Sequence, residues 1–377
     1  MMKNYGEIYR FEIKKIMKNR LTVAMLIVTV LFILIEALIP KLYMSKEMEE
    51  GQKVLEGAVI DDALLQEMYP KLIDNGTVWT ADNFQYEKVA EIENGIIPDN
   101  ARIREYSADE LYREREAVIL DLMKEERLAD EEIVWWQNEN AKIDTPFTYR
   151  YCQGTINFAQ GMSLTLMCIM LISALCLSTV FTIEHRQRTD QIVISCRNGR
   201  KETYLLKIAA GLSVVIGCSI LSAALLAGLI AVLYGINGLN AIVQMEIPLS
   251  AYSFTMGQFI IVQMIVMISA AILFAAFAMA ISEVVKNSLA VMGIMVGLFI
   301  FGQLELIPPR YRVLAQIKDM LPSNQISIWT LMKYRLVGLG GHYVTTYVAA
   351  PIIYVFIAII LIVIGKVAYD RFQVTGR

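Results

Sequence analysis

Six long apolar stretches alternate with polar segments along the chain. A membrane-spanning α-helix needs about 20 apolar residues, because it must cross roughly 30 Å of hydrocarbon at about 1.5 Å per residue. The stretches cover 21–39, 159–183, 208–234, 256–281, 287–304 and 347–365, of which 287–304 is short and Glu36 is the only acid in a clear span. A buried helix of a soluble protein rarely stays uncharged for so long. The pattern therefore predicts an all-α polytopic membrane protein with six transmembrane helices.

The residues before the first stretch follow a helical period of their own. At about 100° per residue, one face of a helix over 3–19 holds apolar and aromatic side chains: Tyr5, Tyr9, Ile13, Ile16 and Met17. The opposite face is mostly basic: Lys3, Glu7, Arg10, Lys14 and Lys18. Such a helix lies on a membrane surface with its apolar face toward the lipid. We expect an N-terminal amphipathic surface helix within 1–20 and the first transmembrane helix at 21–40.

The polar segment 41–153 predicts a mostly helical domain. Ser107 and Glu110 have the spacing of a capping box, from which one helix would run to about residue 140. Shorter helices are expected at 44–72 and 81–93. The adjacent Trp135 and Trp136 fit a core, a contact with the membrane interface or a ligand platform. The acidic runs fit solvated helix faces or a site for a cation.

The segment 305–346 is broken by Pro308, Pro309 and a glycine cluster at 338–341. We expect short interfacial helices or a re-entrant piece there. The remainder of 154–377 would form helices two to six.

The formal net charge of −3 conceals two regions of opposite sign. The segment 41–153 carries 26 of the 37 acidic residues and 13 of the 34 basic ones, a net charge of −13, and the rest of the chain has a net charge of +10. In a six-helix topology most basic loop residues fall on one side, and Lys and Arg mark the cytoplasmic side. Both termini are therefore expected in the cytoplasm, with 41–153 outside. Only 305–346 departs from this rule, because its basic residues would also lie outside.

No set of catalytic residues is recognisable in the sequence. The two histidines, His185 and His342, fall at opposite membrane faces, and no zinc-protease, serine-hydrolase or phosphate-binding-loop motif occurs. The five cysteines lack metal-site spacing and fit small apolar packing residues. The membrane segments have almost no ionisable group, which disfavours a transporter driven by an ion gradient. We expect no enzyme, no metal or cofactor in this chain, and no nucleic-acid partner.

The polar loop between the second and third stretches begins at Glu184, continues through a short amphipathic piece at 190–196 and an Asn198-Gly199 turn, and leads to Lys207. One interpretation is ordinary anchoring by positive charge on the cytoplasmic side. The other is that a short element held between two membrane helices transmits the movement of a docked partner.

This loop resembles that of the ABC-2 type permease family, which reads roughly Glu-x-x-x-Gly-Thr-x-x-x-Leu-x-x-x-Pro-x-x-Arg and is later followed by Lys. The chain supplies Glu184, Thr189, Ile192 or Val193, Ser195, Arg200 and Lys207, and departs with Arg188 at the glycine and Asn198-Gly199 near the proline. The surface helix, the six-helix order, the outer segment before the last helix and the tail 369–372 are also similar to that family. Segments 57–68 and 146–154 resemble bacterial members with a large first outer loop.

The resemblance implies a permease of the bacterial plasma membrane that pairs with a second permease copy or a paralogue. Two separately encoded ABC ATPase subunits would bind ATP and magnesium. The loop 184–204 would seat in the ATPase as a coupling helix, and the helix at 3–19 would be the connecting helix, with Tyr5, Tyr9, Ile13 and Ile16 on its apolar face. The residues implied in coupling are Glu184, Arg186, Arg188, Thr189, Asp190, Ile192, Ser195, Arg200 and Lys207.

The function that follows is export of an amphipathic, peptide or lipid-like substrate, driven by ATP hydrolysis in the partner. The alternative is a membrane sensor, coupled to an ATPase, that binds a ligand with its outer domain and transports nothing.

Overall fold

The computed structural model describes residues 3–74, 83–97, 105–182, 202–285, 287–304, 307–308 and 311–371. These parts are mostly helical, and five helices among them are long and apolar enough to cross a membrane. The five are α2 (Arg20–Tyr43), α8 continued by the π-helical turn η2 (Gln153–Thr182), α11 (Glu202–Tyr234), α12 (Met256–Val285) and α16 (Thr346–Arg371). The expectation of a helical, multi-pass chain is confirmed.

The fifth apolar stretch, 287–304, is not confirmed as a membrane span. It forms α13 (Ser288–Gln303), a helix of 16 residues that rises only about 24 Å. This is less than the roughly 30 Å of a bilayer core, so α13 is a shorter apolar helix and the described residues contain five candidate spans. It packs against α12 and against the short helix α15 (Pro322–Gln325).

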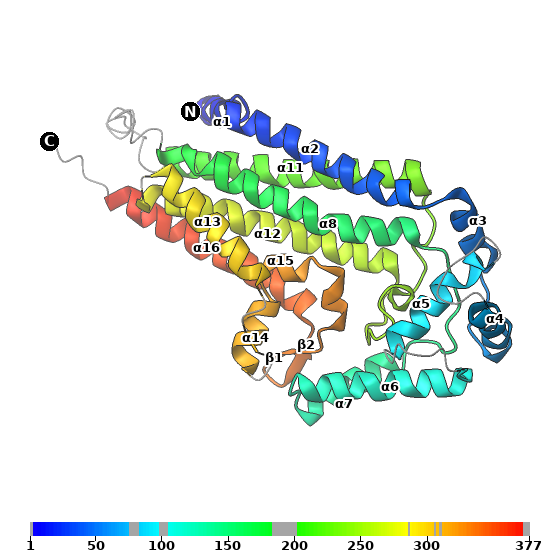
Figure 1. The fold of residues 1–377 in the computed structure, drawn as a ribbon. Coiled ribbons are helices and arrows are strands. Elements are labelled where there is room, and N and C mark those ends of the chain that lie inside the picture. Colours follow the sequence, from blue (N-terminus) through cyan, green and yellow to red (C-terminus); the bar gives the residue numbers. More distant parts are fainter. Residues whose placement is uncertain are drawn as a thin grey trace.

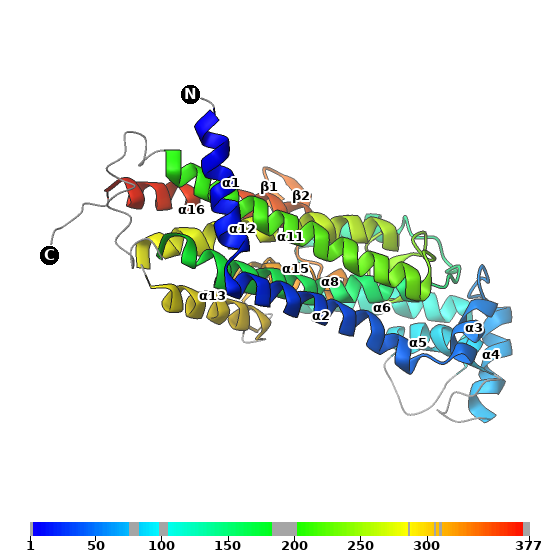
Figure 2. The ribbon, with the colours of Figure 1, turned by 90° about the horizontal axis from the view of Figure 1, so that it is seen from above.

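The five long helices run side by side, with α1 (Lys3–Met17) turned across their direction (Figures 1 and 2). Helix α12 is central, because it contacts α8, α11, α13 and α16. A stripe of small residues in α12 has no exposed surface: Ala270, Ala271, Ala275, Ala276 and Ala278. Small side chains let helix backbones approach closely, so this stripe serves packing between helices and does not face lipid.

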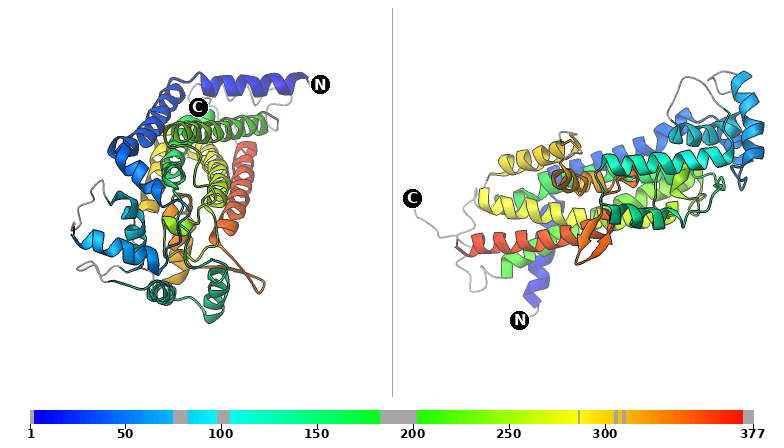
Figure 3. Two further views of the ribbon diagram at one scale, coloured as in Figure 1. Left: turned by 90° about the vertical axis from the view of Figure 1, so that its right-hand side faces the viewer. Right: turned by 90° about the horizontal axis from the view of Figure 1, so that it is seen from below.

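The polar segments gather at one end of the bundle (Figure 3). We call this part the head: the described residues of 44–152, 235–255 and 307–345. Its first part holds α3 (Lys46–Val54), α4 (Asp62–Asp74), η1 (Phe84–Tyr86), α5 (Glu87–Ile96), α6 (Ala108–Glu125) and α7 (Asp130–Asn140). The other two segments add η3 (Val243–Met245), α14 (Arg312–Asp319), α15, η4 (Ile328–Met332), β1 (Val337–Leu339) and β2 (His342–Val344).

Three segments of the head differ in the structure from what the sequence predicts. The capping box at Ser107 and Glu110 is confirmed, but the helix expected to continue to residue 140 breaks at Arg127, whose φ of 57° is left-handed. The helix expected over 44–72 is broken near Gly57, with a φ of 83°. The glycine cluster at 338–341, expected only to interrupt structure, forms a hairpin in which Gly340 and Gly341 both have positive φ, as a tight two-residue turn requires.

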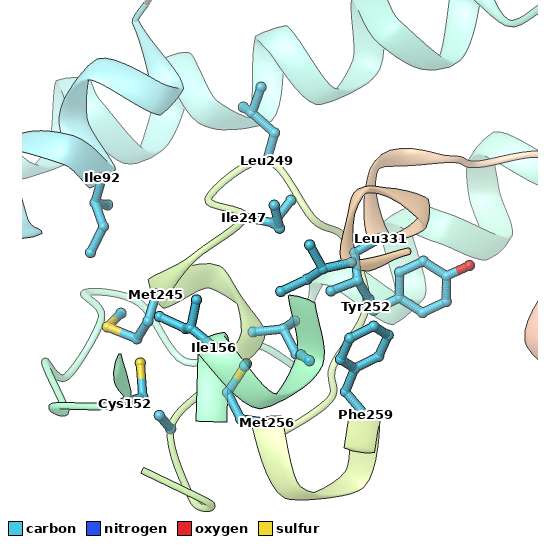
Figure 4. Close-up of a cluster of buried hydrophobic side chains, with 14 of the residues drawn as sticks. Ile92, Cys152, Ile156, Met245, Ile247, Leu249, Tyr252, Met256, Phe259 and Leu331 are labelled. Atoms are coloured by element: carbon cyan, nitrogen blue, oxygen red, sulfur yellow. The ribbon is translucent and has the colours of Figure 1, made fainter. Parts of the chain in front are cut away.

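A single hydrophobic cluster joins the head to the long helices (Figure 4). Ile92 of α5 and Tyr252 of the 235–255 segment belong to the same cluster as Ile156 of α8 and Phe259 of α12, together with Leu331 of η4. The head is therefore packed onto the bundle by shared apolar contacts, and 235–255 lies between the two.

Arg115 of α6 ties this contact together with hydrogen bonds. Its side chain is 1% exposed, and it donates to the carbonyl oxygens of Pro248 (2.7 Å) and Ser250 (2.7 Å) and to Asn140 Oδ1 (2.9 Å). The guanidinium also lies 5.3 Å from the ring centre of Phe147. Burial lowers the pKa of Arg115 to about 10, so the group stays charged at neutral pH.

Two of the basic residues of 305–346 that departed from the positive-inside rule, Arg312 and Arg335, are paired with acids. Arg335 Nη1 lies 2.5 Å from Asp319 Oδ2 and 3.6 Å from Glu126 Oε1, and Arg312 Nη2 lies 2.5 Å from Glu132 Oε2. Glu132 has no exposed surface, so Arg312 compensates a buried charge. These two arginines therefore have a structural reason to lie beside the acidic segment.

The adjacent tryptophans belong to the core. Trp136 has no exposed surface, donates from Nε1 to the carbonyl oxygen of Tyr334 at 2.6 Å, and packs edge-on against the rings of Tyr252 and Tyr334. Trp135 is partly buried against the same cluster. Of the three interpretations of this pair, the core is the one that the structure supports.

Replacing Arg115 by alanine should destabilise the contact between head and bundle. The carbonyl groups of Pro248 and Ser250 would lose their donor, and an unpaired buried carbonyl costs about 1–3 kcal/mol. We expect the free energy of unfolding in detergent to fall by about 3 kcal/mol, measured by denaturant or thermal unfolding. Arg113→Ala, an exposed position on the same helix, is the control and should change it by less than about 0.5 kcal/mol. Equal effects of the two substitutions would contradict this role for Arg115.

Candidate functional site

The end of the bundle opposite the head is where the sequence places its candidate coupling residues. Helix α1, the start of α11 and the end of α16 meet there, and we call it the terminal end (Figure 1). Asn19 separates α1 from α2, because its side chain accepts a hydrogen bond from Leu21 N at 3.1 Å and caps the second helix.

Helix α1 is fixed to α11 by polar contacts at two places. The Tyr5 hydroxyl donates to Glu202 Oε1, and the Tyr9 hydroxyl donates to Ser213 Oγ at 2.7 Å. The hydrogen bond to Glu202 raises the pKa of Tyr5 above its ordinary value, so the phenol remains a donor. A movement of α1 would therefore be passed directly to α11.

The apolar face of α1 is turned to the protein for most of its length. Ile16 is 5% exposed, and Tyr9 and Ile13 pack against the hydrophobic cluster at this end. Phe11 is 64% exposed, and Tyr5 and Met17 are also exposed. This differs from the expectation that the predicted face would meet lipid: α11 covers it.

A pocket of about 250 Å³ lies where α1 crosses the end of α8. Glu12 lines it and is only 4% exposed, and Lys15 Nζ lies 3.4 Å from Glu12 Oε2. Thr179 and Val180 of α8 form the other wall. The pocket gives α1 room to shift against α8.

Three aromatic rings connect the ends of three long helices. Phe181 follows η2, Tyr204 lies in the first turn of α11, and Tyr369 lies near the end of α16. The ring centres are 5.5 Å apart for Phe181 and Tyr204, 5.4 Å for Tyr204 and Tyr369, and 6.0 Å for Phe181 and Tyr369. Such spacings are favourable for aromatic pairs, so the cluster couples these three helix ends mechanically.

The hydroxyl of Tyr204 fixes the distance between α11 and α16. It donates to the carbonyl oxygen of Ile362 at 2.9 Å, and it lies over Gly365, where an added Cβ would be 2.5 Å from it. The same Cβ would lie 3.3 Å from Ala280 Cα of α12. Glycine at 365 is therefore required for three helices to meet this closely.

Lys207 is the one predicted coupling residue that the structure describes. It has no exposed surface, and its Nζ lies 5.0 Å from the centre of the Phe181 ring. A buried lysine cannot be the outermost contact with a partner. It is placed to hold the start of α11 under the aromatic cluster.

The other predicted coupling residues lie outside the described residues: Glu184, Arg186, Arg188, Thr189, Asp190, Ile192, Ser195 and Arg200. The structure describes the helices on either side of these residues: the first ends at Thr182 and the second begins at Glu202. In the connecting helix, Tyr5, Tyr9, Ile13 and Ile16 all turn toward α11 and the bundle.

Sequence reasoning missed the buried members of this end: Glu12, Phe181, Tyr204, Glu283 and Gly365. The resemblance of the tail 369–372 to the family drew attention to Tyr369, but it gave no indication that Phe181 and Tyr204 pack against it. Among the described residues, no group of three or more His, Cys, Asp or Glu side chains is arranged to hold a metal ion.

Replacing Gly365 by alanine should force α16 away from α11. Overfilling a packed contact costs about 1–3 kcal/mol, and we expect a loss of that size in the free energy of unfolding. Adding Tyr204→Phe should recover part of the loss, because the atom that the new Cβ meets first is then gone. Gly217→Ala in α11, where no atom lies within 4 Å, should not destabilise and is the control. If Gly365→Ala unfolds like the wild type, the close approach described above is wrong.

Comparison with known proteins gives one match. The family model described as ABC-2 family transporter protein matches residues 7–371, which includes α1, all five long helices, the head and the loop between α8 and α11. No curated protein and no solved structure matches significantly. The match covers nearly the whole chain and agrees with its several apolar helices: the chain is a multi-pass membrane protein that belongs to the ABC-2 transporter family.

Proposed function

We propose that the chain is the permease of an ABC exporter and that separately encoded ATPase subunits drive it. The observation that carries the proposal is the family match over 7–371, which supports a permease subunit of an ABC transporter. The distribution of charge agrees with a separate energy source. In the long helices, Glu36 of α2 is the only charged side chain more than five positions from a helix end. The described spans therefore offer few charged groups that could bind a driving ion.

The ATPase would bind at the terminal end. The loop 184–204 would enter a groove of the ATPase, with α1 as the connecting helix beside it. The contacts that support this are the hydrogen bonds from α1 to α11 and the aromatic cluster, because together they link α1, α8, α11 and α16. Closure of two ATPase subunits on ATP would then tilt these helices together rather than one at a time.

The terminal end would face the cytoplasm of a bacterial cell and the head would lie outside. The excess of Lys and Arg around α1 and in 184–207 supports this orientation. The acidic head pairs Arg312 and Arg335 internally, which accounts for two of the basic residues that depart from the rule. A second permease, identical or paralogous, would complete the path.

A sensor is the second candidate function. A pocket of about 460 Å³ between α6 and α7 supports it, with Arg113, Glu116 and Asn140 among its polar lining and Trp136 at its base. In that case the head would bind a ligand and the ATPase would respond without transport of cargo. Movement of a substrate, measured directly, distinguishes the two functions.

Complex formation should depend on the loop 184–204. We expect Glu184→Ala combined with a Gly-Ser replacement of 190–196 to lower recovery of the ATPase in a pull-down by at least about tenfold, because the docking element is removed. Glu114→Ala, an exposed change in α6, should leave recovery unchanged. Full recovery and full stimulation of ATP hydrolysis with the replaced loop would rule out this coupling role.

The orientation is tested by labelling intact cells with a membrane-impermeant maleimide. A cysteine introduced at Asp109, exposed on α6, should react from outside, whereas one at Lys14, exposed on α1, should react only after lysis. The four described native cysteines are buried, so they give a low background. The opposite pattern would invert the topology.

A further inference from the structure

A polar pocket lies where two long helices enter the head. It has a volume of about 600 Å³ and is lined by the end of α3, by the residues just before α8 and by those just after α11. Its polar lining is Lys53, Glu56, Arg150, Tyr151, Asn237 and Asn240. The pocket is therefore at the level of the span ends, where the headgroups of a bilayer would lie.

An apolar groove of about 150 Å³ continues from the pocket along the helices. It runs between α8, α11 and α12, and its walls include Gly154, Phe158, Ala227, Ala231 and Ile260. Ala227 lies seven residues before the end of α11, so the groove reaches roughly 10 Å into the span at the rise of an α-helix.

The groove presents almost no polar atom. Thr155 is the one lining residue with a hydroxyl, and that hydroxyl donates to the carbonyl oxygen of Cys152 at 2.7 Å. The groove adjoins the pocket, because Ile236 and Leu239 line both. Together they form one elongated site with a polar end and an apolar end.

The backbone holds this site in place. Gly238 has a φ of 85°, and an added Cβ would lie 2.5 Å from Cys152 Cα. The turn after α11 is thus pressed against the residue that precedes α8. This contact fixes the joint between the pocket and the groove, so the site exists before any ligand arrives.

Arg150 has the weakest internal partner among the charged groups of the pocket. Its Nη1 is 4.0 Å from Glu56 Oε1, beyond hydrogen-bond distance, and the other carboxylate oxygen, Glu56 Oε2, accepts from Tyr151 N at 2.6 Å. Lys53 lies 2.6 Å from Glu49 Oε1, outside the lining. The charged lining residues are two cations, Lys53 and Arg150, and one carboxylate, Glu56, which is a net charge of +1.

The polar groups of the pocket that have no strong partner are mainly hydrogen-bond donors. In the described part of the chain, the side-chain amides of Asn237 and Asn240 make no hydrogen bond, and the Arg150 side chain is about half exposed at 48%. Arginine and amide N–H groups around a net positive charge suit a phosphate, which arginine can bind through two parallel hydrogen bonds.

We propose that this pocket and groove form a binding site for an amphiphile with a phosphate-bearing headgroup and an aliphatic chain. The phosphate binds to Arg150 and to the amides of Asn237 and Asn240. The chain lies in the groove against Phe158 and Ala231. Binding is a property of this chain alone and needs no ATPase.

The test uses the full chain in maltoside micelles and two fluorescent probes with the same acyl chain: a lysophosphatidylethanolamine and a monoacylglycerol that lacks phosphate. We expect saturable binding of one phosphate probe per chain, at least about tenfold tighter than the neutral probe. Arg150→Gln should reduce binding of the phosphate probe to the level of the neutral one. Ala231→Trp, which fills the groove, should weaken both probes by about tenfold or more.

Matched substitutions distinguish a specific loss of probe binding from a loss of folding. Val232→Trp places the same side chain on the neighbouring position of α11, 84% exposed and outside the groove, and should bind as the wild type does. Lys124→Gln removes an exposed cation of the head that lines neither this pocket nor the one between α6 and α7, and it should also have no effect. The unfolding temperature of every variant checks its folding.

Equal affinity for both probes in the wild type, or undiminished binding by Ala231→Trp, would overturn the proposal. Because no ATPase is present, neither result depends on whether the chain is an exporter.

Discussion

The continuous apolar core between head and bundle is the constraint on which the rest of the structure depends. Ile92 of the head and Phe259 of α12 belong to one cluster, with the 235–255 segment packed between them. Apolar burial stabilises by about 25 cal/mol per Å² and has no preferred direction, so by itself it would allow the head to slide. The hydrogen bonds of Arg115 and Trp136 are directional, and they fix one position. The head is therefore an extension of the bundle and not a tethered domain.

The terminal end is built on a different principle. Its contacts are an apolar cluster, three aromatic rings and three tyrosine hydrogen bonds. These contacts join helix ends directly to one another, whereas at the head end the 235–255 segment is packed between the head and the long helices. In the proposed function that contrast is useful, because a displacement imposed at the terminal end is carried along five rigid helices to a head that must follow them.

Much of the fold could be predicted from sequence because bilayer thickness fixes the length of an apolar helix. The helices α2, α8, α11, α12 and α16 all follow from that rule, as did the capping box at Ser107. The rule does not confirm a span at α13, which is apolar but has only 16 residues. Composition also gave no sign of the break at Arg127, where a left-handed residue ends the helix. Two contacts could not be predicted: that of Arg115 with Pro248 and that of Tyr204 with Gly365. Each joins residues more than 130 positions apart, and one sequence alone does not show which distant residues are in contact.

Transport in a reconstituted system tests the central claim most directly. Proteoliposomes would contain the chain, an ABC ATPase that it recovers in the pull-down, and a panel of labelled amphiphiles and peptides. Both ATP hydrolysis and movement of the label would be recorded. We expect at least one amphipathic compound to stimulate hydrolysis and to move across the bilayer only when ATP and the chain are both present. Stimulated hydrolysis without movement of any compound would contradict export and favour a sensor. Movement driven by an ion gradient without ATP would contradict the proposed energy source.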